Sequence, residues 1–147
     1  MMTINQIQDQ IIEEFAVLAD DRESTIFYLM DLGNKLPPLD PASMVDKNLI
    51  KGCQSKVWLL PEITDGKIYF HADSNTEITK GLISLLIRIF NGQLPDDIVN
   101  ADLFFINKIG MNQMIGSQRS NGFSAMIKQM KLFALTLGRL ERETTNE

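Results

Sequence analysis

The chain of 147 residues contains one cysteine and one histidine. A single cysteine cannot form an internal disulfide. One cysteine with one histidine also supplies too few side chains for structural zinc or for most iron–sulfur sites. We therefore expect no metal site and a reduced thiol, which is typical of a cytoplasmic protein.

Positive charge is also scarce, with 14 Lys and Arg against 19 Asp and Glu and a formal net charge of −5. This balance lacks the electrostatic footprint of a protein that binds nucleic acid or anionic lipid. The first residues show no signal-peptide pattern, and no apolar run reaches the roughly 18 residues that cross a bilayer. P-loop, dinucleotide-binding and nucleophile-elbow motifs are missing as well. The sequence therefore predicts a cytoplasmic protein with protein or small-molecule partners.

Hydrophobic residues make up 44% and charged residues 22% of the chain, which predicts one globular domain over residues 1–147. Apolar spacing predicts a helix after Thr3 that runs through Leu18, and a second from Asp20 or Asp21 to just before "LPPLDP". Further helices are expected over 74–92, 94–100, 102–110 and 122–142, with strands in 56–62 and 67–73. The predicted fold is α+β: an N-terminal helical hairpin, a small antiparallel sheet of about three strands, and C-terminal helices packed on it.

Several local patterns sharpen this prediction. Capping boxes are expected at Thr3 with Gln6 and at Ser74 with Glu77. Gly81 lies inside an apolar helix, where another backbone is expected to pack closely. Asp102 is expected to cap the helix over 102–110. Residues 37–55 and 111–122 are predicted to be irregular loops.

The only cysteine, Cys53, lies near the end of the first of these loops, in "NLIKGCQSKVW". A free cysteine is often an inert, buried residue. Here it follows Gly52, and Lys51 and Lys56 are close in sequence and would favour a reactive thiolate. The residues alone leave both interpretations open.

A catalytic Cys–His pair would have to use His71, and Asp73 projects to the same strand face and could orient it. The alternative is a half-exposed surface histidine. Trp58 is either an interface anchor or, more commonly for a strand tryptophan, part of the core. Arg119 could meet a carboxylate near the reactive loop or could be a solvated loop arginine.

Four segments together resemble the SufE family of sulfur acceptor proteins, which includes the CsdE branch and takes part in iron–sulfur cluster assembly. They are "IKGCQSKVWL", "DGKIYFHADSNTEITKGLISLLI", "LPDDIVNADL" and "GSQRSNGFSAMI". The resemblance runs from the second predicted helix to the last, in the family's order. Its most specific motif is "GCQS" followed by "VW".

The resemblance implies a carrier rather than an enzyme. Its partner would be a group II cysteine desulfurase (SufS- or CsdA-like), a pyridoxal-phosphate enzyme that holds sulfur as a persulfide. By match to the motif, Cys53 would take that sulfur, stimulate the desulfurase and pass sulfur to an iron–sulfur scaffold (SufB-like). The cofactor would belong to the desulfurase, so we expect none in this chain.

The supporting loop residues implied by the match are Lys51, Gly52, Gln54 and Ser55, with possible support from Asp73, Arg119 and Gly122. The alternative function is a stand-alone thiol enzyme, a peroxidase or hydrolase, that uses Cys53 and His71. The motifs leave open the SufE or CsdE branch, the downstream recipient, a homodimer, and the resting position of the Cys53 loop.

Overall fold

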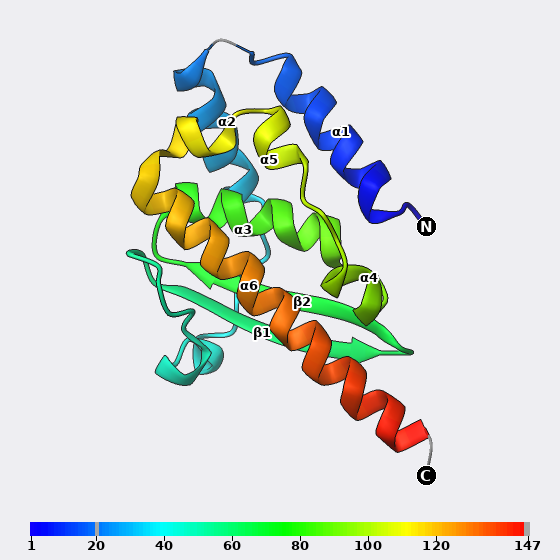
Figure 1. Cartoon of the computed structure of the whole chain (residues 1–147). Helices are drawn as coiled ribbons and strands as arrows, with labels where there is room; N and C mark the ends of the chain where they lie inside the picture. Colours follow the sequence, from blue (N-terminus) through cyan, green and yellow to red (C-terminus); the bar gives the residue numbers. More distant parts are fainter. Residues whose placement is uncertain (20, 146–147) are drawn as a thin grey trace.

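The computed structural model describes residues 1–19 and 21–145 (Figure 1). Helices and strands follow the order α1 (Ile4–Ala16), α2 (Arg22–Asn34), β1 (Val57–Thr64), β2 (Lys67–Ser74), α3 (Glu77–Phe90), α4 (Pro95–Val99), α5 (Phe105–Lys108) and α6 (Met111–Thr145). Two 3-10 turns, η1 (Pro41–Ser43) and η2 (Asp46–Asn48), interrupt the long connection before β1. The α+β prediction is confirmed.

The helical hairpin begins as the capping patterns predict. Thr3 and Gln6 form the expected capping box at the start of α1. Asp21 caps α2 by accepting a hydrogen bond from the Ser24 N–H; the other predicted start, Asp20, lies outside the described residues.

The sheet has two strands in the described residues, not about three. β1 and β2 pair antiparallel from Val57 opposite Ser74 to Thr64 opposite Lys67. Each outer edge carries only one isolated bridge, Leu49 with Trp58 and Ile68 with Gln93. The segments that contain Leu49 and Gln93 each pair with an edge of the sheet at one residue only, so neither segment forms a third strand.

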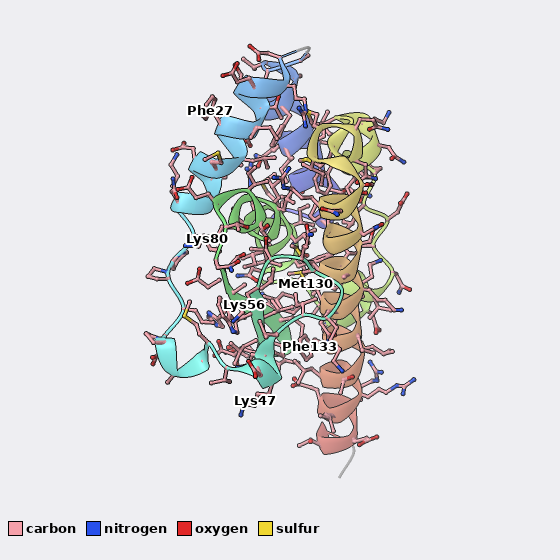
Figure 2. All side chains as sticks on the ribbon, turned by 90° about the vertical axis from the view of Figure 1, so that its left-hand side faces the viewer. Phe27, Lys47, Lys56, Lys80, Met130 and Phe133 are labelled. Atoms are coloured by element: carbon pink, nitrogen blue, oxygen red, sulfur yellow. The ribbon has the colours of Figure 1, made fainter. Side chains whose placement is uncertain are left out.

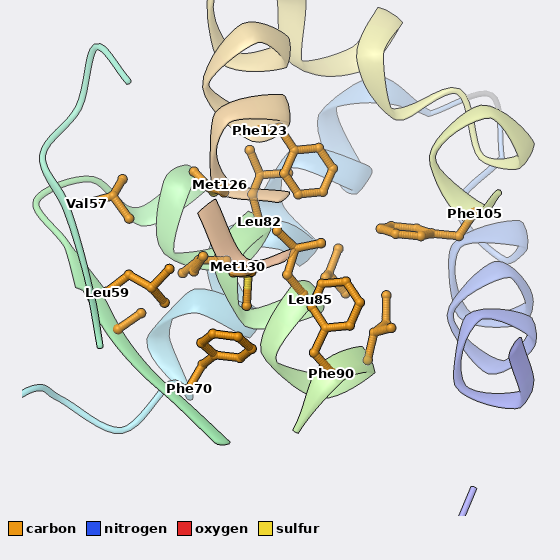
Figure 3. Packing of buried hydrophobic residues seen from close by; sticks show 14 of the residues in the cluster. Val57, Leu59, Phe70, Leu82, Leu85, Phe90, Phe105, Phe123, Met126 and Met130 are labelled. Atoms are coloured by element: carbon orange, nitrogen blue, oxygen red, sulfur yellow. The ribbon is translucent and has the colours of Figure 1, made fainter. Parts of the chain in front are cut away.

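The hydrophobic core lies between the sheet, α3 and α6 (Figure 3). It is formed by fully buried side chains from all three, among them Leu59, Phe70, Leu82, Leu85, Phe90, Phe123 and Met130. α3 is the central helix, and at Gly81 it meets the backbone of α2. A Cβ atom at Gly81 would lie 2.1 Å from the carbonyl oxygen of Leu29, which confirms the predicted close approach.

Several helix starts and ends differ from the predictions. The helix α3 is capped at Thr76 instead of Ser74, whose hydroxyl accepts a hydrogen bond from the Thr76 N–H. α5 follows Phe104, so Asp102 is not its cap. The helix predicted to end at Arg142 continues to Thr145.

The predicted loop over residues 111–122 is wrong, because these residues form the beginning of α6. The helix breaks only at Gly116, where φ is 85°. Small and polar residues such as those of "GSQRSNG" are typical of loops in isolation. Here Met111, Ile115 and Phe123 are buried in the core, and this tertiary packing favours the helix.

A half-buried polar cluster joins α1, α2 and α3. The guanidinium of Arg88 donates two hydrogen bonds to the carboxylate of Glu14, one of them at 3.0 Å from Nη1 to Oε1. The hydroxyl of Tyr28 donates to the same Oε1 at 2.6 Å. Arg88 lowers the pKa of Glu14, and burial together with Glu14 raises the pKa of Tyr28 to about 12.

We expect Glu14→Gln to lower the free energy of unfolding by about 1 kcal/mol at pH 7, the scale of a partly solvated ion pair. Because folding lowers the pKa of Glu14, the stabilisation is present above the ordinary glutamate pKa and is lost as pH falls through the folded value. Urea unfolding of both proteins between pH 7 and pH 3 checks this, with exposed Glu13→Gln as the control. A difference that stays constant across this pH range would contradict the assigned role.

Candidate functional site: the Cys53 pocket

Cys53 lies in a short loop that is fastened at both ends. At its base the N–H of Ile50 donates to the carbonyl oxygen of Val57 at 2.9 Å. Next to this bond, Lys56 and Asn75 are joined by hydrogen bonds of 3.0 and 3.2 Å. The hydroxyl of Thr76, at the start of α3, donates to that of Ser55 at 3.0 Å. Residues 51–56 therefore project as a compact loop at the end of the long connection.

Gly52 allows this loop to turn toward α6. Its φ of +93° is strained for side chains other than glycine, and its Cα faces Ala125 of α6. The next residue, Cys53, points toward the first half of α6.

The thiol of Cys53 occupies a small pocket between the loop, α3 and α6. It is half-buried, and its Sγ donates a hydrogen bond to the carbonyl oxygen of Gly122 at 3.5 Å. The pocket has a volume of about 120 Å³ and is lined by Cys53, Gln54, Ser55, Thr79, Leu82, Gln118, Arg119, Gly122 and Met126. The loop is thus folded onto the protein, with the sulfur turned inward.

Burial dominates the electrostatics of this thiol. It raises the pKa of Cys53, because a thiolate is poorly solvated in the pocket. Lys51 and Lys56 are exposed on the loop, and the expected stabilisation of the thiolate by these cations is wrong for this conformation. At neutral pH the inward-facing sulfur is therefore protonated and weakly nucleophilic.

The structure brings together residues that are far apart in sequence. Gln54, Ser55, Arg119 and Gly122 all line the pocket, whereas Lys51 and Gly52 flank it within the loop. The guanidinium of Arg119 is exposed and donates to the carbonyl oxygen of Ile115, one turn earlier in α6. Arg119 is thus a helical residue at the pocket mouth, contrary to the predicted loop.

Sequence reasoning missed four residues that complete the pocket: Thr79, Leu82, Gln118 and Met126. Gln118 and Met126 are each one helical turn from Gly122 along α6. Their helical spacing would have identified them if residues 111–122 had been assigned to a helix.

Asp73 does not orient His71. One carboxylate oxygen accepts from the N–H of Leu39 at 3.2 Å, and the other accepts from Ser74 and pairs with Lys80 at 3.2 Å. Burial alone would raise the pKa of Asp73, but these hydrogen bonds and the Lys80 ammonium lower it overall. Asp73 instead fastens the start of the long connection to β2 and α3.

The structure does not bring His71 to the cysteine. His71 is opposite Leu60 in the sheet and points away from the face that Val57, Leu59 and Phe70 present to the core. Its exposed imidazole contacts the carboxylate of Glu62 at 2.9 Å. Cys53 instead contacts α6 on the core side, so the two side chains do not form a dyad in this conformation.

Trp58 also belongs to the face of the sheet opposite the core. It is paired with Asp73 and is half-buried, so its interpretation as a core residue is wrong.

Within residues 1–19 and 21–145, no group of three His, Cys, Asp or Glu side chains could hold a metal ion. No helix in these ranges is long and apolar enough to span a membrane.

Comparison with known proteins gives a consistent family match. The family described as "SufE: Fe-S metabolism associated domain" matches residues 9–134. An uncharacterised SufE-like protein of Rhizobium meliloti is 36% identical over 128 residues, which cover 84% of this chain and 91% of that protein. An uncharacterised SufE-like protein of Synechocystis is 33% identical over 134 residues, covering 88% and 82% of the two chains.

The fold has a counterpart among solved structures. The solution structure of a hypothetical protein from Thermus thermophilus superposes with a TM-score of 0.71. The match covers 88% of this chain and 94% of the other, at 19% identity. This likeness supports the fold alone.

Proposed function

The chain belongs to the SufE family and so to the proteins of iron–sulfur metabolism and sulfur transfer; on this premise we propose that Cys53 is a carrier of persulfide sulfur. The sulfur donor is the persulfide of a cysteine desulfurase, which this protein also stimulates by removing its product. The recipient is an iron–sulfur scaffold. In this role the protein is an accessory partner of an enzyme, with no cofactor of its own, and it acts in the cytoplasm as one domain.

The observation that carries this proposal is a single thiol at the tip of a fastened loop, within the motif "GCQS" of the family. In the transfer step, the Cys53 thiolate attacks the terminal sulfur of the donor persulfide. A new S–S bond forms at Cys53, the donor S–S bond breaks, and the donor cysteine leaves as a thiolate. Because the chain has no second cysteine, the new persulfide cannot be released as an internal disulfide.

Transfer requires the loop to leave the pocket, since the donor sulfur must reach Sγ in line. Among the described residues the thiol makes one hydrogen bond, and S–H is a weak donor, whereas N–H and O–H donors make bonds of 2.9–3.2 Å that fasten the base of the loop. The loop can therefore swing outward while its base stays in place. Outside the pocket the burial that raises the Cys53 pKa is removed, which increases the thiolate fraction. The thiol is thus shielded at rest and activated on the donor.

Steady-state assays with the desulfurase and L-cysteine separate this function from a stand-alone thiol enzyme. We expect the wild-type protein to raise the rate of alanine formation several-fold. His71→Ala should stimulate equally, since His71 contacts Glu62 and not the pocket. A wild-type protein that leaves the rate of the desulfurase unchanged would contradict this function, and peroxidase or hydrolase turnover that His71→Ala abolishes would favour the Cys–His enzyme instead.

A further inference from the structure

A second hollow, the lysine groove, adjoins the start of the Cys53 loop and shares no lining residue with the thiol pocket. We define it by the ammonium groups of Lys47, Lys51 and Lys128 and the apolar side chains of Leu59, Leu132 and Phe133. It has a volume of about 460 Å³ and lies between η2, the start of the loop and α6. Figure 2 shows Lys47 and Phe133 on this side of the molecule.

The charge of the groove is opposite to that of the whole chain. The chain carries a net charge of −5, yet three lysines and no acidic residue are among the described residues that line the groove. All three lysines are exposed, and none has an ion pair within residues 1–19 and 21–145. Such a local positive field attracts carboxylates of a partner and speeds their association.

The groove also offers an apolar contact. Leu132 is 51% exposed although it lies beside the half-buried Phe133 and the fully buried Leu59. Leu132 therefore adds an accessible apolar surface next to the lysines of the groove. A matching ligand therefore carries acidic residues around at least one apolar side chain.

The groove is continuous with the reactive loop. Ile50 and Lys51 line it, and Cys53 follows two residues later. Ala125 lines it as well, and its Cβ lies 3.4 Å from the position of a Cβ on Gly52. A segment bound in the groove would therefore touch the loop near Gly52, the residue at which the loop turns toward α6.

We propose that the lysine groove binds an acidic, apolar-centred segment of the sulfur donor and so positions the donor persulfide beside Cys53. This inference rests on the proposed function. It adds the chemistry of the contact between this protein and the sulfur donor, which the proposed function requires. The acidic segment neutralises Lys47 and Lys128 and covers Leu132. Contact with Lys51 and Ala125 couples this binding to the outward movement of the loop.

The test measures the dissociation constant between the purified desulfurase and variants of this protein by calorimetry at low and high NaCl. Lys47→Glu and Lys128→Glu should each weaken binding about tenfold at low salt and less at high salt, because screening reduces the repulsion they introduce. Lys108→Glu has the same charge change at an exposed site on α5 and should stay within about twofold of wild type. Equal effects at all three lysines would overturn the proposal.

The apolar contact is tested with two leucines of α6 that are equally exposed, Leu132 at 51% and Leu140 at 53%; Leu140 is the control. Leu132→Ala should weaken binding about threefold or more at both salt concentrations, while Leu140→Ala should not. Equal effects would contradict the apolar contact. If sedimentation showed a wild-type dimer that Lys128→Glu converts to monomers, a second copy would be the occupant, and the proposal would be wrong.

Sulfur uptake separates this inference from the proposed function. With the desulfurase well above the weakened dissociation constant, Lys47→Glu and Lys128→Glu should still load Cys53, because neither residue lines the thiol pocket. Wild-type protein that binds the desulfurase but gains no sulfur would refute the proposed function and leave the groove intact. Normal loading with unchanged affinity in both variants would refute the groove alone.

Discussion

Cys53→Ser should lower the rate of sulfur acceptance by at least about 100-fold and return alanine formation to the rate of the desulfurase alone, while the protein stays folded. The serine hydroxyl can keep the contact with the carbonyl oxygen of Gly122, so the loop should remain in its pocket. A hydroxyl is not ionised at neutral pH and is a far weaker nucleophile toward sulfur than a thiolate. Alanine formation and intact mass after incubation with L-cysteine measure the loss, and circular dichroism checks the fold.

A relocated thiol provides the matched control. Cys53→Ser/Ser124→Cys moves the only cysteine to an exposed position on α6, two residues beyond Gly122. This double variant keeps one accessible thiol but places it outside the loop, and we expect it to remain inactive. If it accepted sulfur as fast as wild type, the position of Cys53 would not matter, and the loop mechanism would be wrong.

Gly81→Ala should cause a large loss of stability for a single methyl group. The new Cβ would lie 2.1 Å from the carbonyl oxygen and 2.7 Å from the carbonyl carbon of Leu29. These are backbone atoms, so no rotamer change relieves the clash and α2 must move away from α3. Alanine gains about 1 kcal/mol of helix propensity, but overpacking at a rigid contact costs about 3 kcal/mol or more.

We therefore expect a net decrease of at least about 2 kcal/mol in the free energy of unfolding of Gly81→Ala, measured by urea denaturation. The control is Ser84→Ala on the same helix, at a half-buried position, which should change stability by less than about 0.5 kcal/mol. A Gly81→Ala protein as stable as wild type would show that α2 and α3 are not in the close contact described.

Local sequence signals predicted much of the fold. An Asp-Gly pair between two predicted strands favours a tight hairpin turn, and Asp65 and Gly66 have the positive φ of 53° and 78° that such a turn requires. The apolar pattern predicted α3, and Gly81 indicated that another backbone packs closely against it, which the structure shows to be that of α2. These signals depend on residues that are close in sequence, so they can be recognised in a single amino-acid sequence.

The site was less accessible to sequence reasoning, because it is made by contacts between distant segments. Cys53 was found from its motif, but the pocket depends on the first turns of α6, which resemble a loop in isolation. The proximity of Lys51 and Lys56 in sequence suggested a stabilised thiolate, whereas burial between α3 and α6 raises the pKa of Cys53. His71 and Asp73 share a strand face, yet each has a different partner there.

The most direct test of sulfur carriage is a single-turnover transfer followed by mass spectrometry. Desulfurase that has been loaded with persulfide and freed of L-cysteine is mixed with this protein, and both masses are followed over time. We predict that the desulfurase loses one sulfur atom as this chain gains one, and that peptide mapping places it on Cys53. Persulfide that stays on the desulfurase while the wild-type protein remains unmodified would contradict the central claim.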